Sequence, residues 1–352
     1  MVPTSRKYLL ARFPAVRTLP WLPLGTGATP VEMLEGLSSA LGREVWIKRD
    51  DLSGECYGGN KVRKLELLLA AAKAGGHESV LTVGGIGSNH VLATAVYGNA
   101  HGLKTHAVLV PQPVTEAVRE NIVTAARLGV VMHPCAARPL VPLASQRAKR
   151  KANKPYVIAP GGSSALGSLG YLEAALELRA QIDEGLIPAP DDIFVPLGSG
   201  GTVAGLQLGL HLAGIACRLH AVRVVERWLM NKTYVRVLIS SMRRTLVRHG
   251  AVISTDALPE LTVVHDQFGG RYGRSTPAAE AAISQLKKSD DLALETTYTG
   301  KALAGMLEHH HRCEPERRFL FWNTYNSRDL ATIPSAEVPS QIPPAIARTL
   351  DN

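Results

Sequence analysis

The feature that most constrains this chain is a repeated order of short apolar runs followed by longer segments of helical period. Short apolar runs, expected to be buried strands, cover residues 45–47, 80–83, 107–110, 156–159, 193–197 and 219–225. Segments expected to be helices cover residues 61–74, 89–101, 115–128, 167–181 and 203–212. This order predicts an α/β fold with open, twisted, mostly parallel sheets flanked by helices. With 352 residues, the chain is long enough for one or two such domains.

A glycine-rich segment follows one of the predicted strands, which is where parallel sheets place ligands. Residues 198–205 read Gly-Ser-Gly-Gly-Thr-Val-Ala-Gly, between an apolar run and an apolar helix. Backbone N–H groups in such a turn, together with the helix dipole, attract an anion. The spacing fits neither a dinucleotide fingerprint nor a P-loop, so it favours a single phosphate. The alternative is a plain strand-to-helix turn.

One lysine has a setting that suits covalent chemistry. Lys61 follows Gly58, Gly59 and Asn60 and opens a helix with regularly spaced leucines. The positive end of a helix dipole disfavours the ammonium form, and the neutral amine is the form that condenses with an aldehyde. Lys64, one turn later, competes for the role, and a solvated side chain is the ordinary alternative.

A third loop, at residues 84–90, reads Gly-Gly-Ile-Gly-Ser-Asn-His between a strand and a helix. Ser88, Asn89 and His90 together offer a hydroxyl, an amide and an imidazole at a strand's carboxyl end. Such a loop can bind a carboxylate and a ring oxygen. Ser88 could instead simply cap the helix that follows.

These three segments resemble the fold-type II pyridoxal-phosphate family (the tryptophan synthase β-like superfamily). The closest likeness is to its D-cysteine desulfhydrase and 1-aminocyclopropane-1-carboxylate (ACC) deaminase branch. Residues 47–52, Ile-Lys-Arg-Asp-Asp-Leu, and 161–167, Gly-Gly-Ser-Ser-Ala-Leu-Gly, extend the match, although asparagine is more usual than Ser164. The segments occur in family order and spacing from about Leu9 to about Trp322.

The resemblance implies both an architecture and a cofactor. A small domain of residues 61–165 would be inserted between residues 1–60 and 166–352 of a large domain. Pyridoxal 5'-phosphate would sit in the cleft between them, and domain closure would exclude water. The branch also implies a homodimer and a small amino acid as substrate.

Matching residues are expected to take the family's roles. Lys61 would bind the cofactor as a Schiff base and move the Cα proton. Ser88 would meet the substrate carboxylate and assist proton transfer, and Asn89 would bond the cofactor's ring oxygen. Tyr272 and Tyr298 match two active-site tyrosines. Further cofactor contacts are expected from Asn60, Gly198, Ser199, Gly200, Gly201, Thr202 and Thr299, and substrate contacts from Ser88, Asn89 and His90.

Two threonines favour one reaction within the branch. Thr299 stands where the partner of the pyridine nitrogen is placed, and Thr324 at a second position; ACC deaminases resemble one another in having Glu and Leu there. A neutral hydroxyl does not hold that nitrogen protonated, which suits elimination of a good leaving group at Cβ. The resemblance thus favours conversion of D-cysteine to pyruvate, sulfide and ammonia. ACC deamination, β-replacement, racemisation and a catalytically silent cofactor-binding protein are the alternatives.

Several positions depart from the branch. Gly87 replaces a common glutamine, Leu92 and Ala93 replace Arg and Gln, and Arg271 replaces proline. These changes are expected near the substrate and put its identity in question. Residues 323–326, Asn-Thr-Tyr-Asn, replace a His-Thr-Gly-Gly segment and weaken the alignment at Thr324.

Charge and composition argue against other classes of function. Lys and Arg number 39 against 30 Asp and Glu, and 5% of residues are aromatic. The basic run lacks interleaved aromatic residues, so it fits a solvated helix face better than a nucleic-acid surface; it comprises Arg147, Lys149, Arg150, Lys151 and Lys154. No apolar stretch approaches the ~20 residues of a membrane span.

The remaining features indicate location and metal content. Arg6, Lys7 and Arg12 interrupt any leader-like apolar stretch, and the four cysteines form no C-x-x-C pair. We therefore expect a cytoplasmic protein with free thiols. The run at residues 309–311, three histidines, is expected to end a helix on the surface, and no metal site is predicted.

Overall fold

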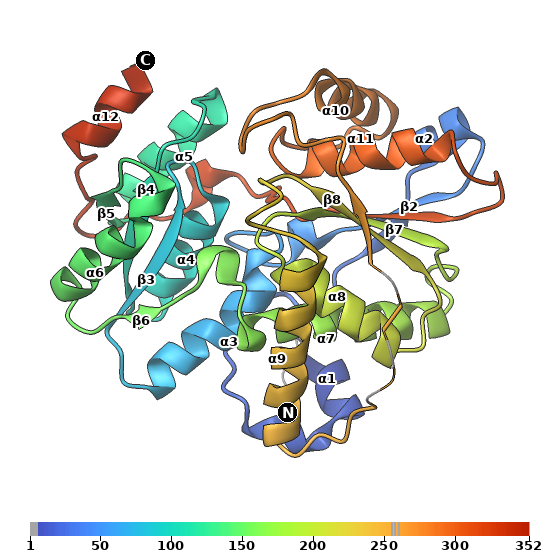
Figure 1. The fold of residues 1–352 in the computed structure, drawn as a ribbon, viewed down its shortest axis with the longest axis horizontal. Helices are drawn as coiled ribbons and strands as arrows, with labels where there is room; N and C mark the ends of the chain where they lie inside the picture. Colours follow the sequence, from blue (N-terminus) through green and yellow to red (C-terminus); the bar gives the residue numbers. More distant parts are fainter. Residues whose placement is uncertain (1–5, 255, 257, 260, 352) are drawn as a thin grey trace.

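The computed structural model describes residues 6–254, 256, 258–259 and 261–351, which form two sheets (Figure 1). Within these residues the larger sheet has six strands in the order β1-β2-β10-β7-β8-β9. Only β1 runs antiparallel to its neighbour. The strands are β1 (Val31–Met33), β2 (Val45–Lys48), β10 (Phe319–Trp322), β7 (Asp192–Leu197), β8 (Arg218–Arg223) and β9 (Thr262–Val264).

Helices cover both faces of this larger sheet (Figure 1). One face carries α2 (Glu35–Leu41), α10 (Pro277–Asp290) and α11 (Thr299–His310). The opposite face carries α1 (Lys7–Arg12), α7 (Ala165–Asp183), α8 (Gly201–Leu212) and α9 (Lys232–Arg248). Because both faces are covered, the central strands are largely apolar, and all four residues of β10 are fully buried.

The smaller sheet is wholly parallel, in the order β5-β4-β3-β6. Its strands are β3 (Ser79–Gly85), β4 (Lys104–Val110), β5 (Val131–Pro134) and β6 (Tyr156–Val157). Alternate residues of β4 pack on opposite sides, as the strand period requires. Ala107 and Leu109 join a core with α3 (Lys61–Ala74), α4 (Asn89–Ala100) and α5 (Glu116–Arg127). Val108 and Val110 pack instead against α6 (Val141–Lys151).

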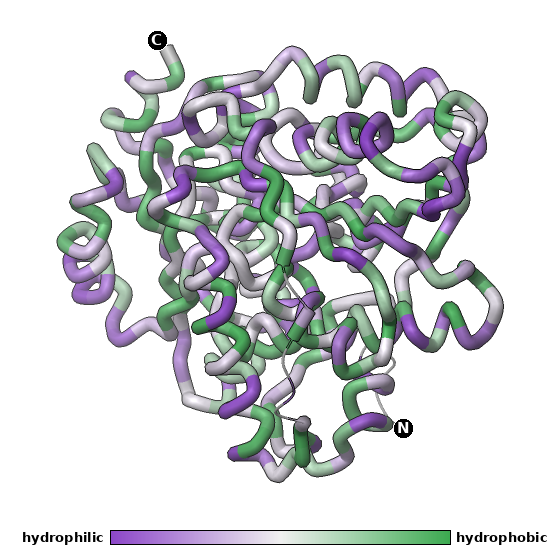
Figure 2. Tube along the Cα trace, turned by 45° about the vertical axis from the view of Figure 1, so that its right-hand side comes forward, coloured by the Kyte–Doolittle hydropathy of each residue, from purple (hydrophilic) through white to green (hydrophobic). Residues whose placement is uncertain are grey.

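Hydropathy follows this architecture. Hydrophobic residues gather around the two sheets, and hydrophilic residues lie on the outer turns of the helices (Figure 2). The basic run on and after α6 is exposed, as expected of a solvated face. Short 3-10 turns connect several elements: η2 (Pro14–Thr18), η3 (Asp50–Leu52), η4 (Arg138–Leu140), η5 (Pro160–Gly162) and η6 (Leu330–Thr332). Among the described residues no helix is both long enough and apolar enough to cross a bilayer.

The α/β prediction is confirmed, and each predicted strand and helix is present with small shifts at its ends. The prolines after Arg328 predict, from the sequence, an extended chain on the surface, and that prediction is wrong. The segment contains α12 (Pro344–Asp351), and Ile333 and Ile346 are buried in the core of the smaller sheet. Proline is compatible with the first turn of a helix because its missing N–H would have no intrahelical partner there.

Candidate active site

A pocket of about 440 Å³ opens where strands of both sheets end. Its walls come from the loops after β3, β7, β8 and β10 and from the segment that leads into α3. Carboxyl ends of parallel strands are where open α/β sheets bind ligands. The pocket therefore lies where the sequence placed its three glycine-containing loops.

Lys61 is the first residue of α3 and lines this pocket. Its Nζ atom donates to the amide oxygen of Asn60 at 2.5 Å and lies 5.9 Å from the ring centre of Tyr298. Burial lowers the pKa of Lys61 to about 8, and the nearby carboxylate of Glu295 opposes that shift. The amine is thus easily deprotonated, as expected, although burial rather than the helix dipole is the main cause.

Lys64, the competing lysine, is buried one turn along α3 and does not line the pocket. Its Nζ atom donates to the carbonyl of Gly161 at 3.2 Å and to Ser163 Oγ at 3.4 Å. Ser163 Oγ in turn accepts from the Gly201 N–H at 3.0 Å. Burial, together with the charge of Lys61, holds the pKa of Lys64 well below its usual value. Lys64 therefore sits behind the glycine-rich loop and supports it by hydrogen bonds, while Lys61 faces the cavity.

The loop that starts α8 has a shape that requires glycine. Gly200 has φ +83°, in the left-handed region that side chains avoid. A Cβ atom on Gly201 would lie 2.5 Å from Ser163 Oγ and 3.0 Å from Lys64 Nζ. The bare backbone thus brings the start of a 12-residue helix to the cavity, where Gly198 and Gly200 line the wall and Gly201, bonded to Ser163, lies behind it. Ser199 and Thr202 also line the pocket, and Thr202 Oγ1 accepts from the Asn60 side chain at 3.0 Å.

The loop before α4 brings Ser88, Asn89 and His90 to the pocket. Ser88 also caps α4, since its Oγ accepts from the Val91 N–H at 3.4 Å. Asn89 Oδ1 accepts from Asn121 at 3.1 Å and from Tyr57 at 3.4 Å, which leaves its amide nitrogen as the atom able to donate to a ring oxygen. His90 bonds Thr82 at 3.0 Å, and burial holds its pKa well below the usual value.

Tyr272 and Tyr298 both line the pocket, and their hydroxyl oxygens are 2.5 Å apart. Burial raises the pKa of each phenol, and that of Tyr298 rises well above 10. Both rings are therefore protonated at neutral pH and can donate a proton only when a stronger base forms beside them. Arg138 from η4 lies 5.1 Å from the Tyr272 ring centre and bonds Glu226 at 2.5 Å.

Thr299 is placed differently from the two tyrosines. It is fully buried and does not line the pocket. Its hydroxyl accepts from the Glu295 N–H at 3.2 Å and donates to the Glu295 carboxylate at 3.1 Å. Thr324 and Glu295, by contrast, both line the pocket. Glu295 also accepts N–H bonds from Thr297, Tyr298 and Thr299, which fixes its carboxylate at the start of α11.

The departures from the branch fall mostly away from the cavity. Four of the changed residues were expected near the substrate, but none of them forms part of the pocket wall. They are Gly87, Leu92, Ala93 and Arg271. Leu92 and Ala93 are buried in the smaller sheet's core, and Arg271 is exposed. Residues 324–326 do line the pocket, so the segment after β10 is the departure that faces a ligand.

A buried ionic network fixes α3 and hence Lys61. Arg63 bonds Asp50 and Glu177, each at 2.8 Å, and Lys48 pairs with the same Glu177. Trp322, at the end of β10, donates its indole N–H to Asp50 at 2.8 Å. Four separate segments thus meet around one arginine, and the helix that carries the pocket lysine is tied to the larger sheet.

A family model described as pyridoxal-phosphate dependent enzyme matches residues 22–324. The chain belongs to this family. Its cofactor is pyridoxal 5'-phosphate, and the residues present fit that group. The glycine loop backed by Lys64 suits a single phosphate, and the half-buried Lys61 amine suits an aldehyde. The cofactor predicted from the sequence is confirmed.

Curated relatives of this pyridoxal-phosphate enzyme fall in one branch. A putative 1-aminocyclopropane-1-carboxylate deaminase of Pyrococcus horikoshii is 33% identical over 90% of this chain and 93% of its own. A D-cysteine desulfhydrase of Serratia proteamaculans is 35% identical over 85% of this chain and 89% of its own. The predicted branch is therefore confirmed, and the chain is a lyase or deaminase of this group.

Solved structures give the same family. A crystal structure of an ACC deaminase homologue has a TM-score of 0.76 and 32% identity, and the match covers 92% of this chain and 95% of that one. The processed form of threonine deaminase isoform 2 from Solanum lycopersicum has a TM-score of 0.61 at 17% identity, a likeness of fold alone; that match covers 92% of this chain and 86% of the other. The fold-type II architecture expected of this pyridoxal-phosphate enzyme is thus present.

Sequence reasoning missed several residues of the site, among them Glu295, Arg138 and Ser163. Glu295 and Arg138 line the pocket, and Ser163 supports the glycine loop. Glu295 precedes a predicted active-site tyrosine by three positions, which is the spacing of a residue that caps a helix start. That spacing could have marked it. Arg138 lies between two predicted elements and carries no comparable signal.

Proposed function

We propose that this enzyme eliminates the Cβ substituent of a small amino acid, and that D-cysteine is its substrate. With uptake of one water, the products are pyruvate, sulfide and ammonia. The observation that carries the proposal is the setting of Lys61. Its readily deprotonated amine faces a pair of tyrosines, in one pocket with a loop suited to a phosphate.

The chain's own residues divide the work as follows. Lys61 attaches the cofactor and then, released, takes the proton from Cα. Ser88 and the start of α4 hold the substrate carboxylate, and His90 supports that loop from behind. Asn89 donates to the cofactor's ring oxygen, and the segment 198–202 holds its phosphate together with Asn60. When bound, the cofactor supplies an electron sink for the charge left at Cα.

The tyrosine pair is assigned to the departing group. Tyr298, nearer to Lys61, passes its proton to the sulfur that leaves Cβ, and Tyr272 donates to Tyr298 as the charge develops. A hydrogen bond between neutral phenols strengthens when one oxygen gains negative charge, so this pair favours the state in which sulfide departs.

D-cysteine is preferred over ACC because of the threonine pair, since the relatives' names include both activities. Opening a cyclopropane offers no good leaving group and demands more of the pyridine ring, whose protonation a carboxylate partner would secure. At the two positions where ACC deaminases resemble one another in having Glu and Leu, this chain has Thr299 and Thr324. Glu295 supplies a carboxylate to the pocket wall, but three backbone N–H groups already hold it.

Further parts of the proposal concern assembly. We assign residues 61–165 to a small domain and residues 1–60 and 166–352 to a large one, with the pocket between them. Residues 1–5 of the large domain, with 255, 257, 260 and 352, lie outside the described residues. We also expect a homodimer, which light scattering of the cofactor-loaded protein would test: a mass near 37.7 kDa rather than twice that value would reject it.

The deciding experiment is an assay of cofactor-loaded protein with D-cysteine, L-cysteine and ACC in parallel. Pyruvate and sulfide released in equal amounts from D-cysteine support the proposal. Faster release of 2-oxobutyrate from ACC would replace it with ring-opening deamination. A new amino acid formed with an added thiol would indicate β-replacement, and exchange of enantiomers would indicate racemisation. No reaction with any substrate would indicate a silent cofactor-binding protein.

A further inference from the structure

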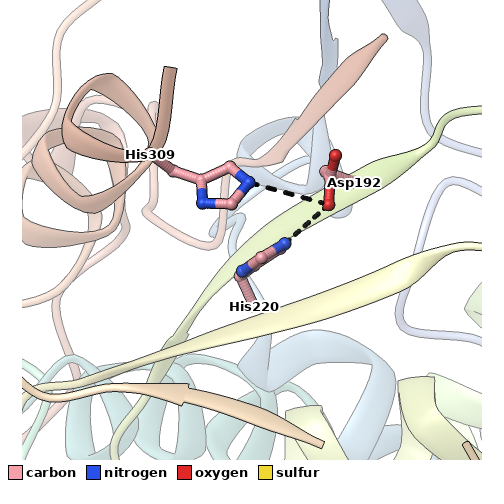
Figure 3. A group of neighbouring side chains, drawn as sticks. All are labelled: Asp192, His220 and His309. Atoms are coloured by element: carbon pink, nitrogen blue, oxygen red, sulfur yellow. Dashed lines mark hydrogen bonds and ion pairs between the residues drawn. The ribbon is translucent and has the colours of Figure 1, made fainter. Parts of the chain in front are cut away.

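Three side chains from distant parts of the sequence converge near the amino-terminal ends of β7 and β8 (Figure 3). The pocket lies at the opposite, carboxyl ends of these strands. Asp192 is the first residue of β7, His220 lies in β8, and His309 lies in the last turn of α11. One ligand atom from each falls within 4.8 Å of the others. Asp192 and His220 are buried, and the side chain of His309 keeps 22% of its surface exposed.

The two imidazoles approach the same carboxylate oxygen (Figure 3). His220 Nε2 bonds Asp192 Oδ1 at 2.6 Å, whereas His309 Nε2 is 4.0 Å from that oxygen, too far for a hydrogen bond. Within the described residues, His309 Nε2 is buried without a hydrogen-bond partner. A buried polar atom without a partner costs about 1–3 kcal/mol, so this nitrogen is suited to a ligand.

We propose that Asp192, His220 and His309 bind one divalent transition-metal ion, zinc being the best fit. Two imidazoles and a carboxylate are ligands that zinc prefers, and water would complete the tetrahedron. Bonds of ~2.0–2.1 Å place two tetrahedral ligand atoms roughly 3.3–3.4 Å apart. The two separations here, 2.6 and 4.0 Å, lie on either side of that value. A small turn of the Asp192 carboxylate equalises them.

The surroundings leave a ligand atom of Asp192 and of His220 available to an ion. Asp192 Oδ2 accepts from Arg317 Nε at 2.5 Å, which orients the carboxylate and leaves Oδ1 for the ion. His220 Nδ1 has no partner within the described residues, so its ring can carry the hydrogen there and present Nε2.

The sequence predicted that the histidine run ends a helix on the surface and that the chain has no metal site, and our proposal departs from the second expectation. The helix does end at His310, but His309 turns toward ligands 117 and 89 positions earlier in the chain, which the sheet brings beside it. β7 is six residues long, so Asp192 at its start lies about 20 Å from the phosphate loop that follows its end. The ion would not touch the reaction; it would join β7 and β8 to α11, the helix that Tyr298 precedes.

The test is zinc binding by untagged, cofactor-loaded protein after chelator treatment, measured by calorimetry and metal analysis. We expect one zinc per chain, and at least a tenfold loss of affinity in His309→Gln and in Asp192→Asn. His309→Gln alters a partly exposed side chain, so it keeps the test valid if the buried variant fails to fold. The matched control is the double variant H310Q/H311Q, which removes the neighbouring imidazoles and should bind zinc as the parent does.

Each outcome decides the matter. Loss of zinc binding in His309→Gln, with retention in the H310Q/H311Q control, supports the site. A rise in Tm on addition of zinc that is seen in the parent and the control, but not in the ligand variants, also supports it. Absence of saturable binding in the parent would leave the cluster a hydrogen-bonded network and overturn the proposal. Loss of binding in the H310Q/H311Q control instead would assign the metal to the exposed run, which also overturns it.

Discussion

The hydroxyl oxygens of Tyr272 and Tyr298 lie 2.5 Å apart within the pocket, with Lys61 on the Tyr298 side and Arg138 on the Tyr272 side. The two rings come from chain positions 26 residues apart and meet edge to face, with centres 6.0 Å apart. One phenol therefore donates its hydroxyl hydrogen to the other. The hydroxyl hydrogen of the second phenol is then free to point toward the substrate.

This order predicts unequal effects of removing the two hydroxyls. Tyr298→Phe should lower kcat about 10²-fold or more, because it removes the proposed donor to the departing group. Tyr272→Phe should cost less, about tenfold, because it removes only a supporting hydrogen bond. Steady-state kinetics with D-cysteine measures both, and the cofactor absorbance band, unchanged in each variant, serves as the control. Equal effects of the two variants would contradict the assigned order.

Lys61 and Lys64 are predicted to differ in their roles. Lys61→Ala should abolish the absorbance band of the lysine-bound cofactor and its trapping by borohydride. Lys64→Ala should keep the linkage but weaken cofactor affinity by at least tenfold, because the hydrogen bonds that hold Gly161 and Ser163 behind the phosphate loop are lost. Absorbance titration with pyridoxal phosphate separates the two. A trapped cofactor in Lys61→Ala would move the covalent role to Lys64.

Much of the fold was predictable because each layer of a parallel α/β protein has its own sequence period. Strands such as Asp192–Leu197 are buried on both faces and read as nearly unbroken apolar runs, and α3 was predicted at its observed bounds. The glycine loop and Lys61 were predictable because backbone geometry restricts the residues that can stand there.

Other features depended on contacts between distant segments and left no local signal. Glu295 acts on Lys61 through space, and His309 meets Asp192 only because α11 packs on β7. Thr299 appeared to be a ligand from its position beside Tyr298. In the fold its hydroxyl is bonded by Glu295, a carboxylate that alignment by motif did not single out.

Glu295 is predicted to set the basicity of Lys61. Its charge raises the pKa of that amine, while burial lowers it, with a net value of about 8. Glu295→Gln should remove the opposing charge and move the pKa of Lys61 below 8. The rate at which cofactor-free protein rebinds pyridoxal phosphate should then reach half its maximum at lower pH. Glu295→Asp keeps the charge and is the control; an unshifted midpoint in Glu295→Gln would contradict the coupling.

The buried network around Arg63 predicts a pH-dependent loss of stability. Burial acts to raise the pKa values of Asp50 and Glu177, but the charge and hydrogen bonds of Arg63 outweigh it and hold both below their ordinary 3.8 and 4.5. A depressed carboxyl pKa contributes stability above the unfolded-state value and loses it as the pH falls. Arg63→Met should therefore lower the free energy of unfolding by about 3–5 kcal/mol at pH 7, since both buried carboxylates lose their guanidinium partner, although Lys48 still pairs with Glu177.

The same reasoning fixes the sign of the pH effect and its control. Below about pH 4.5 the unfolded carboxyls become protonated, the parent loses this contribution, and the gap between parent and Arg63→Met should narrow. Arg179→Met removes an exposed pair with Asp183 and should cost no more than about 0.5 kcal/mol at any pH. Urea unfolding at pH 7, 5 and 4 measures all three proteins. A gap that stays constant, or widens in acid, would mean that Arg63 stabilises α3 by packing and not by charge.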